Sequence, residues 1–296
     1  MCVHVEVRLS GRPMTAAVDR EWQAAYSERP KRNDMATILD EILGFKRQEV
    51  ERQKGEVPLG VLERQLATSL PVRSLTRALS TPGGVGSRII AEIKRRSPVK
   101  GELKAEVDPL AIARMYEANG AAAISLITDY RFFAGRREDL PLLRREVSIP
   151  IFRKDFIIDE YQLVESRVLG ADAVLLIVAG LPPKRLEALH RFALFLEMEV
   201  LVEVHTREEM EKALDLGARV LGINNRNLHT FVTDLQVTLD LVTMVPPGRV
   251  VVSESGIRNR DEIEQLERAG VHAFLVGESL MRSEDAAGKL RELVGG

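Results

Sequence analysis

Eight short apolar segments alternate with segments of helical periodicity between residue 88 and the end of the chain. Each short segment is rich in Val, Ile, Leu or Ala, and the eight span residues 88–94, 122–127, 150–153, 173–178, 200–204, 220–224, 249–254 and 272–277. Continuous apolar runs of this length are typical of strands that are buried on both faces of a parallel sheet. The alternation therefore predicts a series of βα units.

The helical segments share a stop signal. Glycine follows the predicted helices 107–119, 160–169, 207–216 and 260–269, at positions 120, 170, 217 and 270. Glycine is favoured just after a helix because it adopts the left-handed conformation without steric cost. Eight βα units within residues 35–296 fit the ~250 residues of a (β/α)8 TIM barrel in the α/β class. A doubly wound open sheet is the alternative, but the Gly-rich loop expected after its first strand is absent.

Residues 1–34 differ in composition from everything that follows. They are polar, carry scattered charges and contain no apolar core of a signal peptide. Thr37 then stands where it can cap an amphipathic helix that runs through Leu43 and Val50. We predict an N-terminal extension over residues 1–34, either disordered or a start-site artefact. A single catalytic barrel domain over residues 35–296 then follows, with extra helices before strand 1.

Composition excludes several classes of function. The net charge of −2 gives no overall field to recruit nucleic acid or an anionic membrane. The single cysteine, Cys2, excludes a disulfide within the chain and a cysteine-based metal site, and the five histidines form no HExxH pair. No apolar stretch approaches the ~20 residues of a membrane helix. We expect a cytoplasmic protein with no metal, no nucleic-acid partner and no membrane partner.

Charged and polar side chains stand at the ends of the predicted strands, where a buried strand should be apolar. They are Glu92, Lys94, Lys154, Glu203, Asn224 and Glu254. In a (β/α)8 barrel the carboxyl ends of the strands form the active-site face. Two ammonium groups and three carboxylates at one mouth can shift each other's pKa values and exchange protons. One such charge could be a structural ion pair, but five together predict a built site.

Small residues follow the last two strands. Ser255 and Gly256 come after the seventh strand, and Gly277 and Glu278 after the eighth. Small residues there let backbone N–H groups approach a phosphate, although glycines could also serve only to make tight turns. Glu278 fits an anion site only if its side chain points away while its N–H donates.

The roles of several residues near the strand ends stay open. Arg226 could bind an anion or pair with a carboxylate, and His205 is predicted to be a loop residue. Phe133 and Phe156, with Phe132, could wall an aromatic substrate site or cap the barrel core. The arginines at 136, 137, 144 and 145 are interpreted as a solvated helix face.

Six segments together resemble the indole-3-glycerol phosphate synthase family of tryptophan biosynthesis. They are 90–98 (IAEIKRRSP), 147–157 (VSIPIFRKDFI), 201–205 (LVEVH), 222–226 (GINNR), 253–257 (SESGI) and 274–281 (FLVGESLM). The resemblance covers residues 35–296. It implies a lyase that closes the pyrrole ring of 1-(2-carboxyphenylamino)-1-deoxyribulose 5-phosphate with loss of CO₂ and water, and it implies no cofactor. Two loops depart from the family pattern, at Val99 and at Arg136, where the family usually has serine.

The resemblance also implies roles for individual residues. Lys154 would be the general acid, and Lys94 would contact the substrate carboxylate. Glu203 would stabilise a cationic intermediate and move protons, and Glu92 would pair with Lys94 and serve the dehydration. The remaining positions would hold the substrate: Asn224 and Glu254 at the hydroxyls, Arg226 and Phe156 at the pocket wall, and Ser97, Ser255, Gly256, Gly277 and Glu278 at the phosphate.

Competing functions are separable by chemistry. Phosphoribosylanthranilate isomerisation needs a Cys/Asp pair, and Cys2 lies far from every predicted strand end. A Schiff-base aldolase that uses Lys154 also competes, as does a barrel that only binds a sugar phosphate. The expected partner is a small phosphorylated aromatic amino-sugar. We expect a monomer that associates at most weakly with other tryptophan-pathway enzymes.

Overall fold

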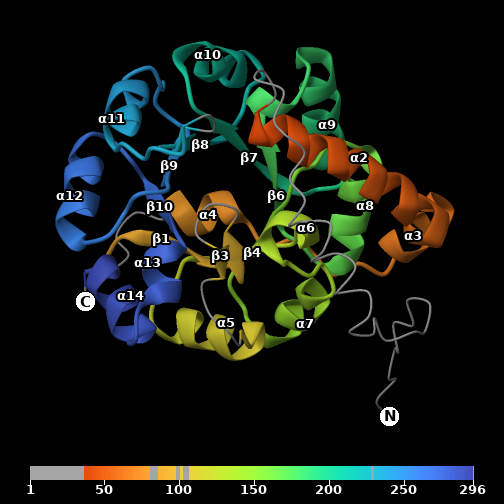
Figure 1. Ribbon diagram of the computed structural model, residues 1–296, viewed down its shortest axis with the longest axis horizontal. Coiled ribbons are helices and arrows are strands. Elements are labelled where there is room, and N and C mark those ends of the chain that lie inside the picture. Colours follow the sequence, from red (N-terminus) through yellow and green to blue (C-terminus); the bar gives the residue numbers. More distant parts are fainter. Residues whose placement is uncertain (1–36, 81–85, 98–100, 103–106, 228–229, 296) are drawn as a thin grey trace.

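A closed barrel of eight parallel strands forms the centre of the molecule (Figure 1). The computed structural model describes residues 37–80, 86–97, 101–102, 107–227 and 230–295, so residues 1–34 and Val99 lie outside the described part. The barrel strands are β1 (Arg88–Ile93), β4 (Ala123–Ile127), β5 (Ile151–Lys154), β6 (Ala173–Ile177), β7 (Glu199–Val204), β8 (Val220–Asn224), β9 (Val250–Glu254) and β10 (Ala273–Val276). Because β1 pairs with both β4 and β10, the sheet is closed, which confirms the predicted barrel and excludes the open sheet.

Helices form a ring around the barrel. They are α5 (Pro109–Ala118), α6 (Tyr130–Phe133), α7 (Asp139–Glu146), α8 (Glu160–Leu169), α9 (Pro183–Phe195), α10 (Arg207–Asp215), α11 (Gln236–Val242), α12 (Arg260–Arg268), α13 (Glu278–Arg282) and α14 (Ala286–Val294). A 3₁₀ turn, η1 (Val178–Gly180), and a small sheet of β2 (Arg96–Ser97) and β3 (Gly101–Glu102) complete the loops at the mouth. The glycines at 120, 170, 217 and 270 have φ of 92°, 91°, 79° and 101°, so the predicted helix ends are confirmed.

The two faces of each strand pack into two separate cores. On β7, Val200 and Val202 face the helices, and Leu201 faces the barrel interior. Successive side chains of a strand point to opposite faces, so Glu203, two residues after Leu201, also points inward. The interior core ends where the strands end, and this alternation brings the charged strand-end residues to one mouth.

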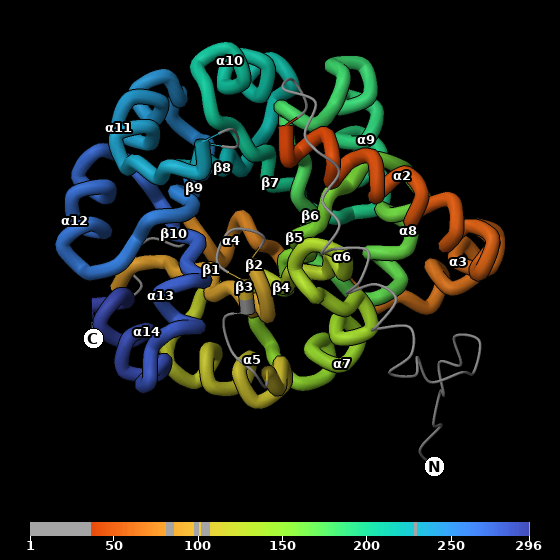
Figure 2. Tube along the Cα trace, in the orientation of Figure 1, coloured from red at the N-terminus to blue at the C-terminus, as the bar shows by residue number. Residues whose placement is uncertain are grey.

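Three helices precede β1 in the described chain: α2 (Ile38–Glu56), α3 (Leu59–Leu66) and α4 (Leu75–Ser80). Thr37 caps α2 in a capping box with Asp40, as its position predicted. α4 lies within the ring of strands in Figure 2, and its Leu75 and Leu79 join the interior core. α4 thereby closes the end of the barrel at which the strands begin, and α2 lines the opposite, open end. No helix in the described ranges is both long enough and apolar enough to span a membrane.

Candidate active site

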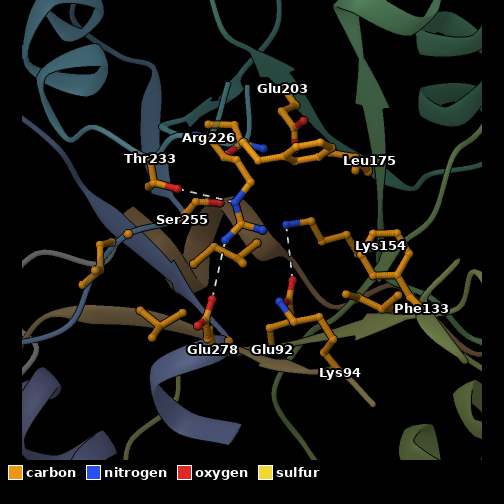
Figure 3. Close-up of a pocket in the computed structure, with 18 of the residues that line it drawn as sticks. Glu92, Lys94, Phe133, Lys154, Leu175, Glu203, Arg226, Thr233, Ser255 and Glu278 are labelled. Atoms are coloured by element: carbon orange, nitrogen blue, oxygen red, sulfur yellow. Dashed lines mark hydrogen bonds and ion pairs between the residues drawn. The ribbon is translucent and has the colours of Figure 1, made fainter. Parts of the chain in front are cut away.

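A pocket of about 810 Å³ opens at the carboxyl ends of the strands. Its floor and walls include Glu92, Lys94, Lys154, Glu203 and Asn224, which end four different strands or begin the loops after them. Figure 3 shows Glu203 and Lys154 reaching into the mouth from different sides, with Glu92 and Lys94 facing Lys154. The structure therefore brings together the charged residues that the sequence placed at strand ends. We name Glu92, Lys94, Lys154, Glu203 and Glu254 the mouth cluster.

Lys154 is the centre of the mouth cluster. Its Nζ lies 2.8 Å from Glu254 Oε2 and 3.3 Å from Glu92 Oε2, and its side chain is 18% exposed. Burial disfavours the ammonium, but the carboxylates of Glu254, Glu92 and Glu203 outweigh it and raise the pKa of Lys154 above its usual value. Lys154 is therefore a protonated donor that reaches into the pocket.

Glu92 connects the two lysines. Its Oε1 lies 2.7 Å from Lys94 Nζ, and its other oxygen faces Lys154. Burial opposes its charge, but Lys94 and Lys154 lower the pKa of Glu92 to about 2. A Cβ at Gly277 would crowd Glu92 Oε1, so a larger residue at this position would force the carboxylate to move. The glycine predicted for a phosphate loop thus also shapes the acid–base site.

Glu254 is fully buried and carries the opposite pKa shift. Burial raises the pKa of Glu254 to about 7; Lys154 opposes this shift and Glu203 adds to it. Its Oε1 has no hydrogen-bond partner among the described residues and lies where a Cβ on Gly222 would approach to 2.3 Å. The mouth cluster therefore pairs a low-pKa and a high-pKa carboxylate on one lysine, an arrangement suited to proton transfer.

The loops after β9 and β10 form a corner of the pocket. Ser255 and Gly256 both have positive φ, 67° and 88°, and Ser279 Oγ donates to the carbonyl of Ile257 at 2.6 Å, which ties the two loops together. A non-glycine residue with positive φ is uncommon, and such strain is found at functional loops. The corner contains the four residues predicted for the phosphate loops.

The expectation for the side chain of Glu278 was wrong. Instead of pointing away, it lines the pocket and faces Arg226 Nη2 at 3.6 Å and Arg282 Nε at 3.5 Å. Figure 3 shows Arg226 between Glu278 and Thr233. Two guanidinium groups offset the negative charge at this corner, which is why a carboxylate is tolerated there. Arg226 therefore belongs both to the pocket wall and to an ion pair.

Aromatic side chains line one wall of the pocket. The rings of Phe133 and Phe156 lie 6.2 Å apart with an interplanar angle of 34°, and both residues border the pocket. Phe132 is buried instead, edge-on to Phe45 of α2 at 5.7 Å. The three phenylalanines therefore divide between the two expected roles: Phe133 and Phe156 wall the pocket, and Phe132 packs beneath α2.

Two predicted site residues take secondary positions. Ser97 is buried in β2 and does not border the pocket. Asn224 ends β8 at the pocket, and its Oδ1 accepts the backbone N–H of Arg226 at 3.1 Å. The adjacent Asn225 was not predicted as a site residue, yet its Nδ2 donates at 3.0 Å to Ser253 Oγ and to the carbonyls of Glu254 and Ser255. Asn225 thereby fixes the loop after β9.

A second ion cluster lies on the outer side of β5. Lys46 of α2 is 2% exposed and its Nζ lies 2.8 Å from Asp155 and 3.0 Å from Asp129. Arg153 donates to Asp155 at 3.1 Å and to Glu165 of α8 at 2.9 Å. We name these five residues the outer cluster; no sequence pattern indicated that Lys46 belongs to it. The cluster fixes α2 to β5 directly beside Lys154.

The interpretation of the arginines in the α7 region as a solvated face was wrong for two of them. Arg137 pairs with the same Glu165 at 2.6 Å. Arg144 is buried and donates to both oxygens of Asp172, at 2.8 and 2.9 Å. Glu165 lies on α8 and Asp172 directly precedes β6. Each of these acidic partners is 28 residues away from its arginine along the chain.

Within the described ranges, no three His, Asp or Glu side chains are arranged to hold a metal ion.

The closed barrel and its charged mouth define a (β/α)8-barrel enzyme. The solved structures of thiamine phosphate pyrophosphorylase from Pyrococcus furiosus and KGPDC from Streptococcus mutans share this fold. The first has a TM-score of 0.54 and 21% sequence identity, over 74% of this chain and 96% of its own. The second has a TM-score of 0.54 and 16% sequence identity, over 70% of this chain and 95% of its own.

Sequence comparison identifies the family. The family model for indole-3-glycerol phosphate synthase matches residues 39–293. Indole-3-glycerol phosphate synthase of Syntrophobacter fumaroxidans is 46% identical over 88% of this chain and 98% of its own length. The same enzyme of Burkholderia ambifaria is 44% identical over 88% of this chain and 99% of its own length. That of Dehalococcoides mccartyi is 46% identical over 87% of this chain and 100% of its own length. The chain belongs to the indole-3-glycerol phosphate synthase family.

Proposed function

We propose that this chain is the indole-3-glycerol phosphate synthase of a tryptophan pathway and that its mouth cluster performs the chemistry. The reaction converts 1-(2-carboxyphenylamino)-1-deoxyribulose 5-phosphate to indole-3-glycerol phosphate, CO₂ and water. The observation that carries the assignment of roles is the ammonium of Lys154, held at the pocket by Glu254 and Glu92. A carbonyl condensation needs such a donor at the carbonyl oxygen.

Ring closure is the first step. The ring carbon that bears the carboxylate attacks the substrate carbonyl carbon, and Lys154 donates a proton to the carbonyl oxygen, which becomes a hydroxyl. The attack leaves the aromatic ring as a cation, and Glu203, buried at the end of β7, faces the pocket where its carboxylate stabilises that charge. Loss of the carboxylate as CO₂ then returns its bonding electrons to the ring.

Dehydration completes the indole. The new hydroxyl leaves as water when a proton is supplied to it, and a proton is removed from the adjacent carbon. Glu92 is the base that we assign to this step, because it lines the pocket and Lys94 and Lys154 keep it ionised by lowering its pKa. Lys94, 2.7 Å from Glu92, is placed to contact the substrate carboxylate and to take part in the later proton transfer.

The rest of the pocket matches the remaining parts of this substrate. The loops with Ser255, Gly256 and Gly277 form a corner suited to the phosphate. Asn224 lines the pocket, where it would hold a hydroxyl, and the buried Glu254 orients Lys154 from behind the pocket lining. The apolar rings of Phe133 and Phe156 suit the benzoate ring, and Arg226 supplies a cation at the corner where Glu278 lies.

A Schiff-base mechanism fits the site less well. It requires Lys154 as a free amine, whereas the carboxylates of Glu254, Glu92 and Glu203 raise the pKa of Lys154 and keep it an ammonium. We also propose that residues 35–296 form one catalytic domain and that the protein acts in the cytoplasm as a monomer.

The test is to mix the purified protein with the substrate and to follow indole fluorescence. Wild-type protein should produce the signal, and Lys154→Ala should reduce it at least about 10³-fold, because the general acid is lost. Lys54→Ala is the matched control, since Lys54 pairs with Glu51 and Asp159 on the surface of α2 and α8, away from the pocket. Full activity of Lys154→Ala would overturn the assigned role, and no turnover by wild-type protein would overturn the proposed function.

A further inference from the structure

His205 occupies a place that the proposed mechanism does not use. It follows β7, two residues after Glu203, and its side chain is 10% exposed. Its Nε2 lies 3.4 Å from Glu203 Oε1, and its Nδ1 lies 3.2 Å from Glu209 Oε2. The ring is therefore placed between a carboxylate of the mouth cluster and a carboxylate of α10.

Glu209 fixes the orientation of this ring. Its Oε2 accepts the backbone N–H of His205 at 2.7 Å as well as contacting Nδ1. Two contacts from one oxygen to the backbone and the ring of the same residue leave Nε2 directed at Glu203. Nε2 itself is buried and has no hydrogen-bond partner among the described residues.

The charges around the ring favour its cationic form. Burial disfavours it, but the carboxylates of Glu209, Glu203 and Glu254 outweigh burial and raise the pKa of His205 above 6.5. On its other side His205 borders a pocket of about 530 Å³ between α10 and α11, whose charged lining residues are Arg207 and Asp240.

We propose that His205 is a positioning residue for Glu203, and that its imidazolium keeps the Glu203 carboxylate oriented toward the pocket during the reaction. The proposal rests on the proposed function, because it deepens the role of Glu203 in stabilising the ring cation. Loss of the proton from His205 removes the cation beside Glu203. Turnover then falls as pH rises through the pKa of His205, while binding of the phosphate, at the loops after β9 and β10, is unaffected.

The experiment compares the pH dependence of kcat in wild type, His205→Gln and Glu209→Gln. His205→Gln has no titrating ring, so its kcat should not decline as pH rises through the pKa of His205. On the acid side its kcat should be about tenfold lower than that of wild type, with KM little changed. Glu209→Gln keeps an acceptor for the backbone N–H but removes a negative charge, so the decline should move to lower pH. His272→Gln, at the opposite end of the barrel, is the matched control and should keep the wild-type profile.

Either of two outcomes would overturn the proposal. One is a His205→Gln profile with the wild-type decline and the wild-type kcat. The other is a rise in KM with kcat unchanged, which would mean that His205 serves substrate binding or local structure only. Circular dichroism of each variant confirms folding. Wild-type turnover in the same assay tests the proposed function separately, so the failure of one does not imply the failure of the other.

Discussion

The two ion clusters meet at one strand, on its opposite sides, and each is built from acidic and basic side chains. Lys154 on the inner side of β5 belongs to the mouth cluster, and its sequence neighbours Arg153 and Asp155 belong to the outer cluster. In the outer cluster no buried side-chain nitrogen or oxygen lacks a hydrogen-bond partner within the described chain. In the mouth cluster Glu254 Oε1 is left without one among the described residues, and the other four members of the cluster line the pocket.

The difference shows how one strand can serve stability and catalysis at once. Buried charges that are fully paired hold the structure together only as a set, and removal of one partner leaves another charge uncompensated. A cluster with an incompletely satisfied carboxylate and an exposed face can instead form new interactions with a substrate. We therefore assign stability to the outer cluster and chemistry to the mouth cluster.

The strongest test of the outer cluster is Lys46→Met. The substitution preserves the volume of the side chain but leaves Asp155 and Asp129 without their shared cation. The free energy of unfolding should fall by about 3–5 kcal/mol, measured by urea denaturation. Lys54→Met on the same helix is the control and should change stability by less than about 1 kcal/mol. Equal stability of the two variants would break the distinction between the clusters.

The pH dependence of stability should separate the clusters with a smaller effect. Burial opposes ionisation of Asp155, but Lys46 and Arg153 hold its pKa well below the usual 3.8, so its contribution exists above pH 3.8 and is lost as pH falls below it. Glu254 has its pKa raised from 4.5 to about 7, so it lowers stability as pH rises through that range. The melting temperature of Asp155→Asn should fall less steeply than that of wild type as pH drops below 3.8. The melting temperature of Glu254→Gln should change less than that of wild type between pH 4.5 and 7. A Glu254→Gln profile parallel to that of wild type would contradict the assigned shift.

Deletion of residues 1–34 should have the smallest effect. Thr37 and Asp40 complete the cap of α2, so both clusters retain their contacts. Turnover and the free energy of unfolding should equal those of the full chain. A large loss of turnover would show that the mouth depends on the extension and would refute the proposed boundary.

The barrel and its mouth could be predicted from the sequence because both follow from short-range rules. Strand ends in a (β/α)8 barrel meet at one face, so Lys154, Glu203 and Glu254 could be placed together without knowing their contacts. Period-two alternation could also have assigned Arg153 and Asp155 to the face opposite Lys154.

The outer cluster and the role of His205 were not accessible in this way. Lys46 is one more charge on an amphipathic helix, and its partners Asp129 and Asp155 come from two later βα units. His205 depends on the rotamer of Glu209 and on its distance from Glu203. The prediction for Glu278 was wrong because one of the charges that offset it, Arg226, comes from the loop after β8, whereas Arg282 lies in α13 itself, four residues after Glu278. Partner choice over such distances is set by packing and not by local pattern.

The most direct measurement of the central claim compares two neighbours on β5, Lys154→Met and Arg153→Met, by turnover and by urea denaturation of the same preparations. We expect Lys154→Met to lose ring closure while its free energy of unfolding falls by less than half as much as that of Arg153→Met. Arg153→Met should unfold at clearly lower urea, and its remaining folded fraction should still produce indole fluorescence. A Lys154→Met protein that turns over normally, or an Arg153→Met protein as stable as wild type, would contradict the division between the two clusters.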